Sequence, residues 1–414
     1  MISEARITFV SRSDSEGGAA IATSRLFSVI RRDYPNAEML CATRVKDAPK
    51  VRGLHPNRAL KSWLRLANRV NAPRYVLSPS SKAAQFTRNR IPINFTIKTE
   101  IKKSSLVHLH WTSMGTLPES WLTGSSVPIV WTLHDMWPLT GGCHYSGSCK
   151  RYEAGCGNCP LLRPAKGSDL SARNLEKRIR IFAGRQLHIV APSMWLADKA
   201  RLSLVFRNRP ITVIPNGVDS ELFGGEPPAK ARRELGFPVD RPVLLVGSES
   251  LSDKRKGTDL VWAALSAIDR KITAAVFGSG SIPRISNPNV EVVEFGFVKD
   301  AKQIARLYSS ADVFCCASRE DNLPNTAVEA VVSGTPVVGF NSGGLPEIVD
   351  NGVSGIISDT LSPQSLLRSI NIVLDSAPHR FSRGAIRELG VNRFGIQAIA
   401  QRYKEIYSNL LAGS

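Results

Sequence analysis

Short apolar runs that alternate with longer amphipathic segments most constrain how this 414-residue chain can fold. The runs are the lengths of buried strands, and segments with helical spacing separate many of them. The runs lie at 7–10, 106–109, 129–132, 188–191, 212–214, 243–246, 274–277, 290–293, 313–316 and 337–340, and examples of the helical segments are 257–268, 301–309, 326–332 and 362–374. This alternation predicts an α/β fold in which parallel sheets carry helices on both faces.

The number of strands and the position of a turn signal predict two domains. Ten strands are too many for one doubly wound sheet in a chain of this length, so we predict two Rossmann-like domains. The turn Pro215-Asn216-Gly217 and the Gly- and Pro-rich stretch 224–238 mark the boundary region. We predict a first domain over 1–210, a second over 211–393 and a terminal helix over 394–414 that packs back towards the first domain.

The positive charge is concentrated in the N-terminal half. Residues 1–200 hold 30 Lys and Arg against 13 Asp and Glu, whereas residues 201–414 hold 24 against 22. This imbalance predicts a polyanionic partner for the first half, or simply a solvated basic surface. The segment 58–70 combines Trp63 with basic residues in a pattern typical of a membrane-surface helix, and equally of a helix packed on a core. Because no nucleic-acid motif is present, we expect an anionic membrane surface and no nucleic acid.

The chain lacks the apolar segments of an inserted or exported protein. No apolar run approaches the roughly 18 residues of a membrane span, and the run at 7–10 is too short for the core of a signal peptide. We therefore expect a cytoplasmic protein that works peripherally at the inner face of the cell membrane.

Two small-residue turns and a basic turn follow predicted strands. Glycine at a strand-to-helix turn lets a ligand approach the backbone, and the helix N-terminus then favours an anion. Cations at the carboxyl end of a parallel strand suit a diphosphate. The small-residue turns are Gly17-Gly18 and Gly343-Gly344, and the cations are Arg255 and Lys256. Each signal alone also fits a tight turn without a ligand.

The segment 318–348 carries the strongest signal. Asp321 and Glu329 lie eight residues apart, and a helix that begins near Asn325 places Glu329 about one turn in. The first amides of this helix, at Asn325 and Thr326, suit a phosphate, and a carboxylate beside them suits sugar or ribose hydroxyls. The segment therefore predicts a site for a nucleotide sugar.

Taken together, these motifs resemble family 4 of the retaining, nucleotide-sugar-dependent glycosyltransferases. The resemblance rests on motifs in the right order along nearly the whole chain: Gly17-Gly18, 132–135, 214–219, 255–257, the Asp321–Glu329 segment with Ala330, and 343–347. The stretch 134–160 is similar to a branch that acts in colanic acid or other exopolysaccharide biosynthesis. The resemblance implies the GT-B architecture, in which two Rossmann-like domains face each other across a cleft.

The resemblance also implies roles for individual residues. Lys256 and Arg255 would hold the diphosphate, so that no cofactor is required for catalysis, and Glu329 would hold the ribose. Asp321 stands where the family usually has a Glu that contacts the donor sugar, and either Asp321 or the adjacent Glu320 could make that contact. Ser248 stands after Gly247, where the family usually has a basic residue.

In the first domain, the resemblance implies that His134 contacts the donor sugar near the reacting centre. A simple packing role for His134 is the alternative, and Asp135 is the rival candidate for a general base. Retention of configuration would come from attack on the face from which the nucleoside diphosphate leaves, with the leaving phosphate oxygen accepting the proton of the acceptor.

Four of the seven cysteines fall within the Gly-rich loop 141–160. They are Cys143, Cys149, Cys156 and Cys159, and His144 is a substitute ligand. Disulfides are rare in the cytoplasm, so this spacing favours a structural zinc ion, with free thiols or a redox pair as alternatives.

The leading interpretation is a retaining glycosyltransferase that moves a sugar from a nucleoside-diphosphate sugar to a saccharide or lipid-linked saccharide acceptor in exopolysaccharide, capsule or O-antigen assembly. One alternative is a nucleotide-sugar epimerase of the same fold, which would consume donor without an acceptor. The other is a zinc-containing nucleic-acid-binding protein, whose binding would depend strongly on salt.

Overall fold

The computed structural model describes residues 4–55, 57–72, 86–164, 166–376 and 379–413. The chain divides into two compact units. The first comprises Met1–Ile214 together with Ile399–Ser414, and the second comprises Pro215–Ala398. The sequence predicts that the first domain ends at 210, four residues before the first unit ends at Ile214. It predicts that the terminal segment begins at 394, five residues before the chain rejoins the first unit at Ile399.

The first unit is built on a parallel sheet with the order β3-β2-β1-β4-β5-β6-β7 among the described residues. Backbone hydrogen bonds join neighbouring strands, and most of the strands are buried on both faces of the sheet. The strands are β1 (Ile7–Ser13), β2 (Glu38–Thr43), β3 (Val51–Leu54), β4 (Leu106–Leu109), β5 (Ile129–Thr132), β6 (Leu187–Ala191) and β7 (Ile211–Val213).

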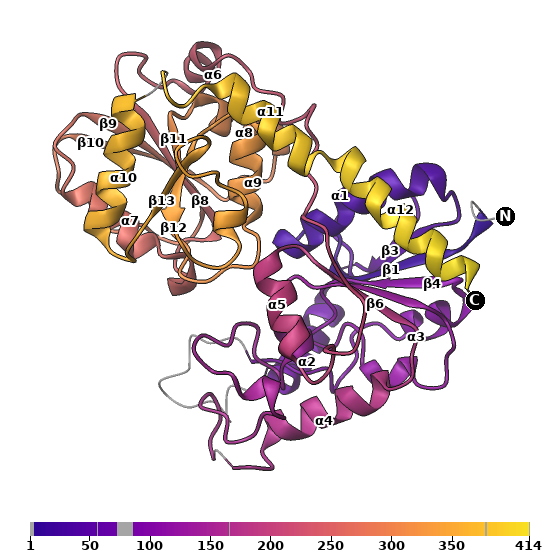
Figure 1. Cartoon of the computed structure of the whole chain (residues 1–414). Helices are drawn as coiled ribbons and strands as arrows, with labels where there is room; N and C mark the ends of the chain where they lie inside the picture. Colours follow the sequence, from indigo (N-terminus) through magenta and orange to yellow (C-terminus); the bar gives the residue numbers. More distant parts are fainter. Residues whose placement is uncertain (1–3, 56, 73–85, 165, 377–378, 414) are drawn as a thin grey trace. The chain divides into compact units, whose positions relative to one another are not determined.

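Helices cover both faces of this sheet. Figure 1 shows α1 and α12 on one side of the strands and α3 and α4 on the other. The helices of this unit are α1 (Gly18–Asp33), α2 (Arg58–Asn71), α3 (Thr96–Glu100), α4 (Leu170–Phe182), α5 (Met194–Leu202) and most of α12 (Ile396–Ala412). A core of fully buried rings, including Trp131, Phe182 and Phe206, lies between the sheet and α4 and α5.

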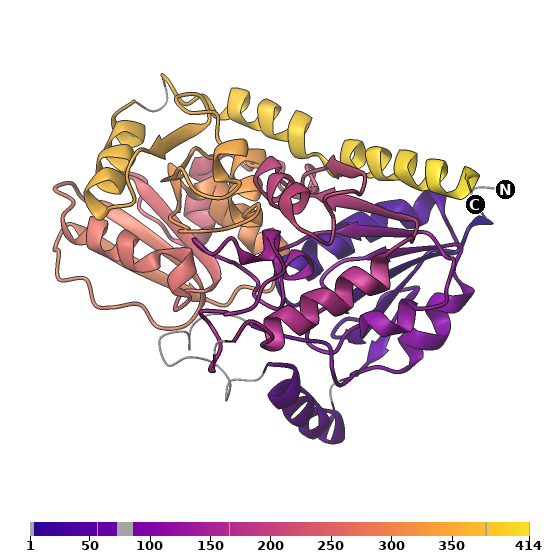
Figure 2. The same cartoon turned by 60° about the horizontal axis from the view of Figure 1, so that its bottom comes forward.

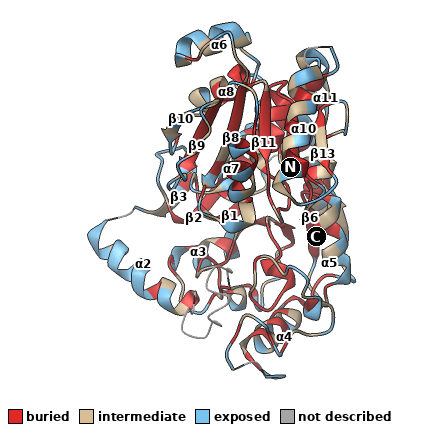
Figure 3. Cartoon of the chain, turned by 90° about the vertical axis from the view of Figure 1, so that its left-hand side faces the viewer, coloured by how far each residue is buried: buried red, intermediate tan, exposed pale blue. Residues whose placement is uncertain are grey.

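The helix α2 is the most exposed element of the first unit. Only Ala67 and Asn71 are buried along it, and Trp63 and Leu66 are exposed to 37% and 53%. Figure 3 shows α2 almost entirely in the colour of exposed residues, and Figure 2 shows it set apart from the sheet. No helix in the described part of the chain is long and apolar enough to cross a membrane.

The second unit repeats the architecture with the strand order β10-β9-β8-β11-β12-β13, again parallel and again counted over the described residues. Figure 1 shows α7 and α10 on one side of the strands and α8 and α9 on the other. The strands are β8 (Val243–Ser250), β9 (Ile272–Ser279), β10 (Val290–Gly296), β11 (Val313–Cys316), β12 (Val337–Phe340) and β13 (Gly355–Ser358). The helices are α6 (Pro228–Leu235), α7 (Thr258–Ser266), α8 (Ala301–Ser310), α9 (Asn325–Val332), α10 (Pro363–Ser376) and α11 (Arg383–Phe394).

Both sheets reverse their strand order at one point. In the first unit the reversal falls between β1 and β4, and in the second it falls between β8 and β11. The connections on either side of such a point leave in opposite directions, so the carboxyl ends of the two strands frame a crevice where doubly wound folds bind ligands. The two doubly wound units confirm the predicted α/β fold, and the candidate residues follow these strand ends.

Candidate functional site

A basic turn follows β8 in the second unit. Lys254–Lys256 forms a single turn of 3-10 helix, and Asp253 caps it by accepting a hydrogen bond from the Arg255 amide (3.0 Å). Gly257 ends the turn with φ 66°, and a Cβ added there would lie 1.9 Å from the carbonyl oxygen of Ala317. Only glycine allows this approach, which brings the basic turn against the end of β11.

Asp321 contacts two of the three cations of this turn, Lys256 and Arg255. Its Oδ2 is 2.6 Å from Lys256 Nζ and 3.3 Å from Arg255 Nη1, and the residue is 8% exposed. Burial alone would raise the pKa of Asp321, but the Lys256 ammonium and the Arg255 guanidinium outweigh it and lower the pKa to about 2. Asp321 therefore stays ionised and keeps both cations at the end of β11.

The backbone around Asp321 is held by the second small-residue turn. Gly343 has φ 59°, and a Cβ added there would lie 1.8 Å from the Asp321 carbonyl oxygen, which accepts a hydrogen bond from the Gly344 amide (3.0 Å). Glu320 enters through its backbone, because its carbonyl accepts a hydrogen bond from Arg255 Nη1 (2.9 Å). The structure thus brings Arg255, Asp321 and the Gly343-Gly344 turn together.

The helix α9 begins at Asn325, where the sequence predicts a helix start. The Asn325 side chain accepts a hydrogen bond from Asn216 Nδ2 (2.8 Å) at this end of the helix. Glu329 lies about one turn further on, is 7% exposed, and accepts a hydrogen bond from the Tyr308 hydroxyl (3.3 Å). The sequence motif gives no indication of Tyr308, which comes from the neighbouring helix α8.

A cavity lies at the carboxyl ends of β8 and β11, where the strand order reverses. Lys256 lines it from the basic turn, Thr326 from the start of α9, and Ser248 from β8. The α9 N-terminus presents the positive end of a helix dipole, and Lys256 contributes a positive charge. These groups can bind an anion, and Asp321 and Glu329 add carboxylates that can accept hydrogen bonds from hydroxyls.

In the first unit, Gly17 and Gly18 lie at the predicted strand-to-helix turn. Gly17 has φ 90° and Gly18 is the first residue of α1. Asp14, which the sequence analysis overlooks, is 6% exposed and accepts hydrogen bonds from the Val45 and Lys46 amides (2.9 and 2.8 Å). Asp14 therefore ties this turn to the end of β2.

His134 follows β5 and belongs to a cluster of histidines. Its Nε2 lies 3.0 Å from Nδ1 of His110, which follows β4. Beneath them, His108 contacts Thr132 (2.8 Å) and the hydroxyl of Tyr407 on α12 (2.6 Å). Burial lowers the pKa of His134 to about 4 and lowers the pKa of His108 and of His110 as well. His134 is therefore a neutral imidazole at pH 7.

Asp135 is fully engaged in hydrogen bonds. Its Oδ2 lies 2.7 Å from Trp111 Nε1 and 2.7 Å from His144 Nδ1, and its Oδ1 accepts from the Trp137 amide (2.8 Å). Burial alone would raise the pKa of Asp135, but His144 and the hydrogen bonds lower it overall. Such a carboxylate suits a structural role better than that of a general base, because Trp111, His144 and the Trp137 amide already donate to its oxygens.

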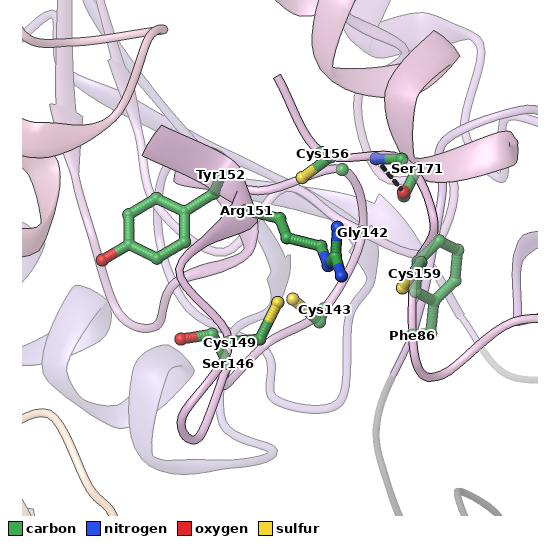
Figure 4. A pocket seen from close by; sticks show the side chains of 12 residues that line it. Phe86, Gly142, Cys143, Ser146, Cys149, Arg151, Tyr152, Cys156, Cys159 and Ser171 are labelled. Atoms are coloured by element: carbon green, nitrogen blue, oxygen red, sulfur yellow. Dashed lines mark hydrogen bonds between the residues drawn. The ribbon is translucent and has the colours of Figure 1, made fainter. Parts of the chain in front are cut away.

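The four loop cysteines line one cavity of the first unit. Figure 4 shows Cys143, Cys149, Cys156 and Cys159 around it, together with Phe86 and Arg151. All four are free thiols, and burial raises the pKa of Cys143 to about 12 and of Cys156 to about 11. His144 takes no part, because its second ring nitrogen contacts the Thr87 hydroxyl (2.8 Å).

As they stand, these thiols do not form a finished metal site. In the described ranges, no group of three or more His, Cys, Asp or Glu side chains is arranged so that it could hold a metal ion. The spacing of the cysteines nevertheless brings them to one place. Gly155, Cys156, Gly157 and Asn158 have positive φ in succession, and this reversal turns Cys156 and Cys159 towards the same cavity.

Two family models match the chain, one largely in the first unit and one within the second. The model "Glycosyltransferase Family 4" matches residues 41–222, and the model "Glycosyl transferases group 1" matches residues 241–376. The second match contains the basic turn, Asp321 and the whole of α9.

Curated relatives of the chain include named glycosyltransferases. The chain is 28% identical to a D-inositol 3-phosphate glycosyltransferase of Thermobispora bispora, over 70% of this chain and 69% of that protein. It is 25% identical to the putative colanic acid biosynthesis glycosyl transferase WcaC of Escherichia coli, over 69% of each chain.

Solved structures share the fold. Sucrose-phosphate synthase from Thermosynechococcus elongatus superposes with a TM-score of 0.68 at 18% identity, over 99% of this chain and 100% of that one. HepE of Anabaena, solved with UDP and glucose, superposes with a TM-score of 0.63 at 18% identity, over 98% and 100%. The two doubly wound units thus form the GT-B fold, and the chain belongs to the family 4 glycosyltransferases.

Proposed function

We propose that this glycosyltransferase retains anomeric configuration and moves a sugar from a nucleoside-diphosphate sugar to a lipid-linked saccharide during assembly of an exopolysaccharide, capsule or O-antigen. The observation that carries the proposal is the cavity at the ends of β8 and β11, which Lys256 and the start of α9 line together. HepE of Anabaena, which was solved with UDP and glucose and with UDP-glucose, supports a donor of this class.

The second unit supplies the donor-binding groups in this proposal. Lys256, Arg255 and the first amides of α9, at Asn325 and Thr326, hold the diphosphate. Glu329 holds the ribose, and its hydrogen bond from Tyr308 fixes its orientation. These groups are in place before the donor arrives, so they stabilise the charge that develops on the leaving diphosphate without reorganising.

Asp321 and Glu320 are the candidates for contact with the donor sugar. Asp321 is ionised and already held by Lys256 and Arg255, so it can accept hydrogen bonds from sugar hydroxyls without changing its charge. The Gly343-Gly344 turn, packed on the Asp321 backbone, keeps this wall of the site close to the ligand.

The chemical step in this proposal requires no enzyme nucleophile. The acceptor hydroxyl attacks the anomeric carbon from the face that the diphosphate leaves, and the leaving phosphate oxygen takes the hydroxyl proton. The sugar–phosphate bond breaks with its electron pair remaining on the diphosphate. We further propose no cofactor for this step, because Lys256, Arg255 and the α9 amides supply the positive charge that the leaving group needs.

The first unit supplies the remaining roles. We propose that His134, neutral at pH 7, contacts the sugar being transferred, and that the Gly17-Gly18 turn lets a ligand approach the start of α1. The acceptor is a saccharide on a lipid carrier, and the basic first half, with the exposed α2, meets the anionic membrane surface that presents it. The similarity to a putative colanic acid transferase supports the choice of pathway class.

We also propose that the four loop cysteines hold a structural zinc ion. Their shared cavity supports this assignment, although the sulfurs must draw closer together to act as ligands. The ion would staple a Gly-rich loop and would have no part in the transfer step.

Single substitutions in the second unit test the donor site. Lys256→Ala removes the positive charge that contacts the diphosphate in the proposed site. Glu329→Gln removes the negative charge that contacts the ribose. We expect each to reduce the rate of sugar transfer by at least about a hundredfold, since several kcal/mol of transition-state stabilisation depends on such contacts. The measurement follows transfer of radiolabelled sugar to lipid extracts.

Lys254→Ala is the matched control, because Lys254 belongs to the same turn but is exposed. This variant should keep most of the activity. Full activity of Lys256→Ala or Glu329→Gln, in protein with an unchanged melting temperature, would overturn the assignment of the site.

A further inference from the structure

Ser248 occupies the strand end at which the second sheet reverses its order. It follows Gly247 near the end of β8, between the neighbouring strands β9 and β11. Glycines fix its backbone from two sides. A Cβ added to Gly247 would lie 2.0 Å from the Phe277 ring, and a Cβ added to Gly278 would lie 2.1 Å from the Ser248 carbonyl oxygen. Ser248 is therefore held in one place by close packing.

The Ser248 hydroxyl is buried and has no hydrogen-bond partner among the described residues. The residue is 7% exposed, and its Oγ is one of few buried side-chain oxygens left without a partner there. A buried hydroxyl without a partner is costly, and its persistence points to a partner that the chain itself does not supply. Ser248 lines the same cavity as Lys256 and Thr326.

The surroundings of the hydroxyl select an anion as that partner. Lys256 brings a positive charge to the cavity, and α9 directs its N-terminal amides towards the same strand ends. Asp321 already pairs with Lys256 and Arg255. A neutral hydrogen-bond donor in the cavity can therefore contact a bound anion without changing this balance of charges. A serine hydroxyl is such a donor.

We propose that Ser248 donates a hydrogen bond to a phosphate oxygen of the nucleoside diphosphate and is a donor-binding residue of this enzyme. The inference rests on the proposed function, which places a nucleoside diphosphate in this cavity. It adds that a neutral hydroxyl from β8, beside the Lys256 ammonium, completes the phosphate contacts.

Calorimetric titration tests the proposal. The probe is whichever of UDP, GDP, ADP, dTDP and CDP the wild type binds most tightly, together with the corresponding nucleoside. Ser248→Ala should weaken binding of the diphosphate about tenfold, since a hydrogen bond to a charged group is lost. It should leave binding of the nucleoside unchanged.

Thr273→Val is the matched control. Thr273 also has a buried hydroxyl without a partner among the described residues, but it lies opposite Val243, at the other end of β8. Both variants should keep or raise the melting temperature, because each removes an unpaired buried hydroxyl. Thr273→Val should bind the diphosphate as tightly as the wild type.

The outcomes of these titrations distinguish a failure of the role of Ser248 from a failure of the proposed donor site. Unchanged diphosphate binding by Ser248→Ala, with a wild type that binds, would overturn the role of Ser248 and leave the proposed donor site standing. Equal weakening by Ser248→Ala and Thr273→Val would also overturn it. A wild type that binds none of the five diphosphates would overturn the donor site itself.

Discussion

At the scale of single residues, one carboxylate organises the proposed donor site. Asp321 accepts from both Lys256 and Arg255, and its low pKa keeps it charged throughout the neutral range. Arg255 also donates to the backbone before Asp321, so it braces the turn as well as carrying charge. Lys256 lines the cavity itself, whereas Arg255 lies beside it, against the Asp321 carboxylate and the Glu320 carbonyl. Arg255 and Lys256 are adjacent in the sequence, but their side chains have different surroundings in the folded chain.

The histidines of the first unit predict how stability depends on pH. His108, His110 and His134 have pKa values lowered by burial, so the unfolded chain takes up protons that the folded chain does not. Stability is therefore retained above the ordinary histidine pKa of about 6.5 and is lost as the pH falls towards 4. Each such group adds roughly 1.4 kcal/mol per pH unit to the slope of the unfolding free energy.

Urea unfolding between pH 7 and pH 4.5 measures this slope. His134→Gln should reduce it by the contribution of one proton, because the substituted side chain takes up no proton on unfolding. A wild-type unfolding free energy that stays constant over this range would contradict the neutral state of the cluster.

At the scale of elements, the proposed donor site and the cysteine cavity both depend on loops whose backbone conformation only particular residues can adopt. Gly257 presses the basic turn onto β11, and Gly343 presses its turn onto Asp321. The cysteine loop has a comparable reversal at 155–158, where two of the residues with positive φ are not glycine. These loops place side chains accurately because the backbone has few other conformations available to it.

The cysteine loop yields a prediction about metal. Freshly purified protein should contain about one zinc ion per chain, and Cys156→Ser should lose both the metal and several degrees of melting temperature, because the loop has few apolar residues to hold it. The measurements are elemental analysis and thermal unfolding, before and after chelation.

Cys41→Ala serves as the control, since Cys41 is fully buried in β2. This variant should lose stability and keep its zinc. Protein that contains no zinc when freshly purified would end the proposal and leave four free thiols.

Most strands are predictable from the sequence because a buried parallel strand is a run of apolar residues. The exceptions are β2, β3 and β13. The apolar run of β2, Met39–Ala42, lies between two buried polar residues, Glu38 and Thr43, and Glu38 pairs with Arg6 and Arg52 from elsewhere in the chain. The strands β3 and β13 are short and half-buried and contain glycine, so no local pattern marks them.

The candidate site is predictable only in part, for a related reason. Lys256, Asp321 and Glu329 belong to motifs whose spacing is visible in the sequence. Tyr308 and His110 are not visible in this way, because their roles arise from contacts between separate elements. Local patterns identify the residues that meet a ligand, and the fold is needed to identify the residues that hold them.

At the scale of the whole molecule, charge and site are divided between two similar units. The excess positive charge belongs to residues 1–200, whereas the anion-binding cavity belongs to the second unit, whose charges nearly balance. The proposed donor cavity therefore does not account for the positive charge of residues 1–200. An anionic membrane surface fits this division, and α2 carries basic residues beside the exposed Trp63 and Leu66.

Vesicle flotation tests this assignment. The double variant Lys61→Glu/Arg65→Glu on α2 should lower binding to phosphatidylglycerol-containing vesicles at least about tenfold, because two attractive charges become repulsive. Binding of the wild type should weaken in high salt and be absent with phosphatidylcholine alone.

The matched control is Lys177→Glu/Arg207→Glu, which changes the net charge equally at exposed positions on other elements. It should bind vesicles nearly as well as the wild type. Equal losses in the two double variants would show that net charge, and not α2, governs the attraction.

The division of α12 between the units has a consequence for how the chain folds as it is made. The first unit needs residues 399–413, because Tyr403 and Tyr407 bond to Thr132 and His108 in its interior. A ribosome delivers those residues only after the whole second unit has emerged. The usual order of synthesis, in which the earlier domain finishes first, is therefore reversed here, and the first unit cannot be completed until residues 399–413 have followed the second unit out of the ribosome.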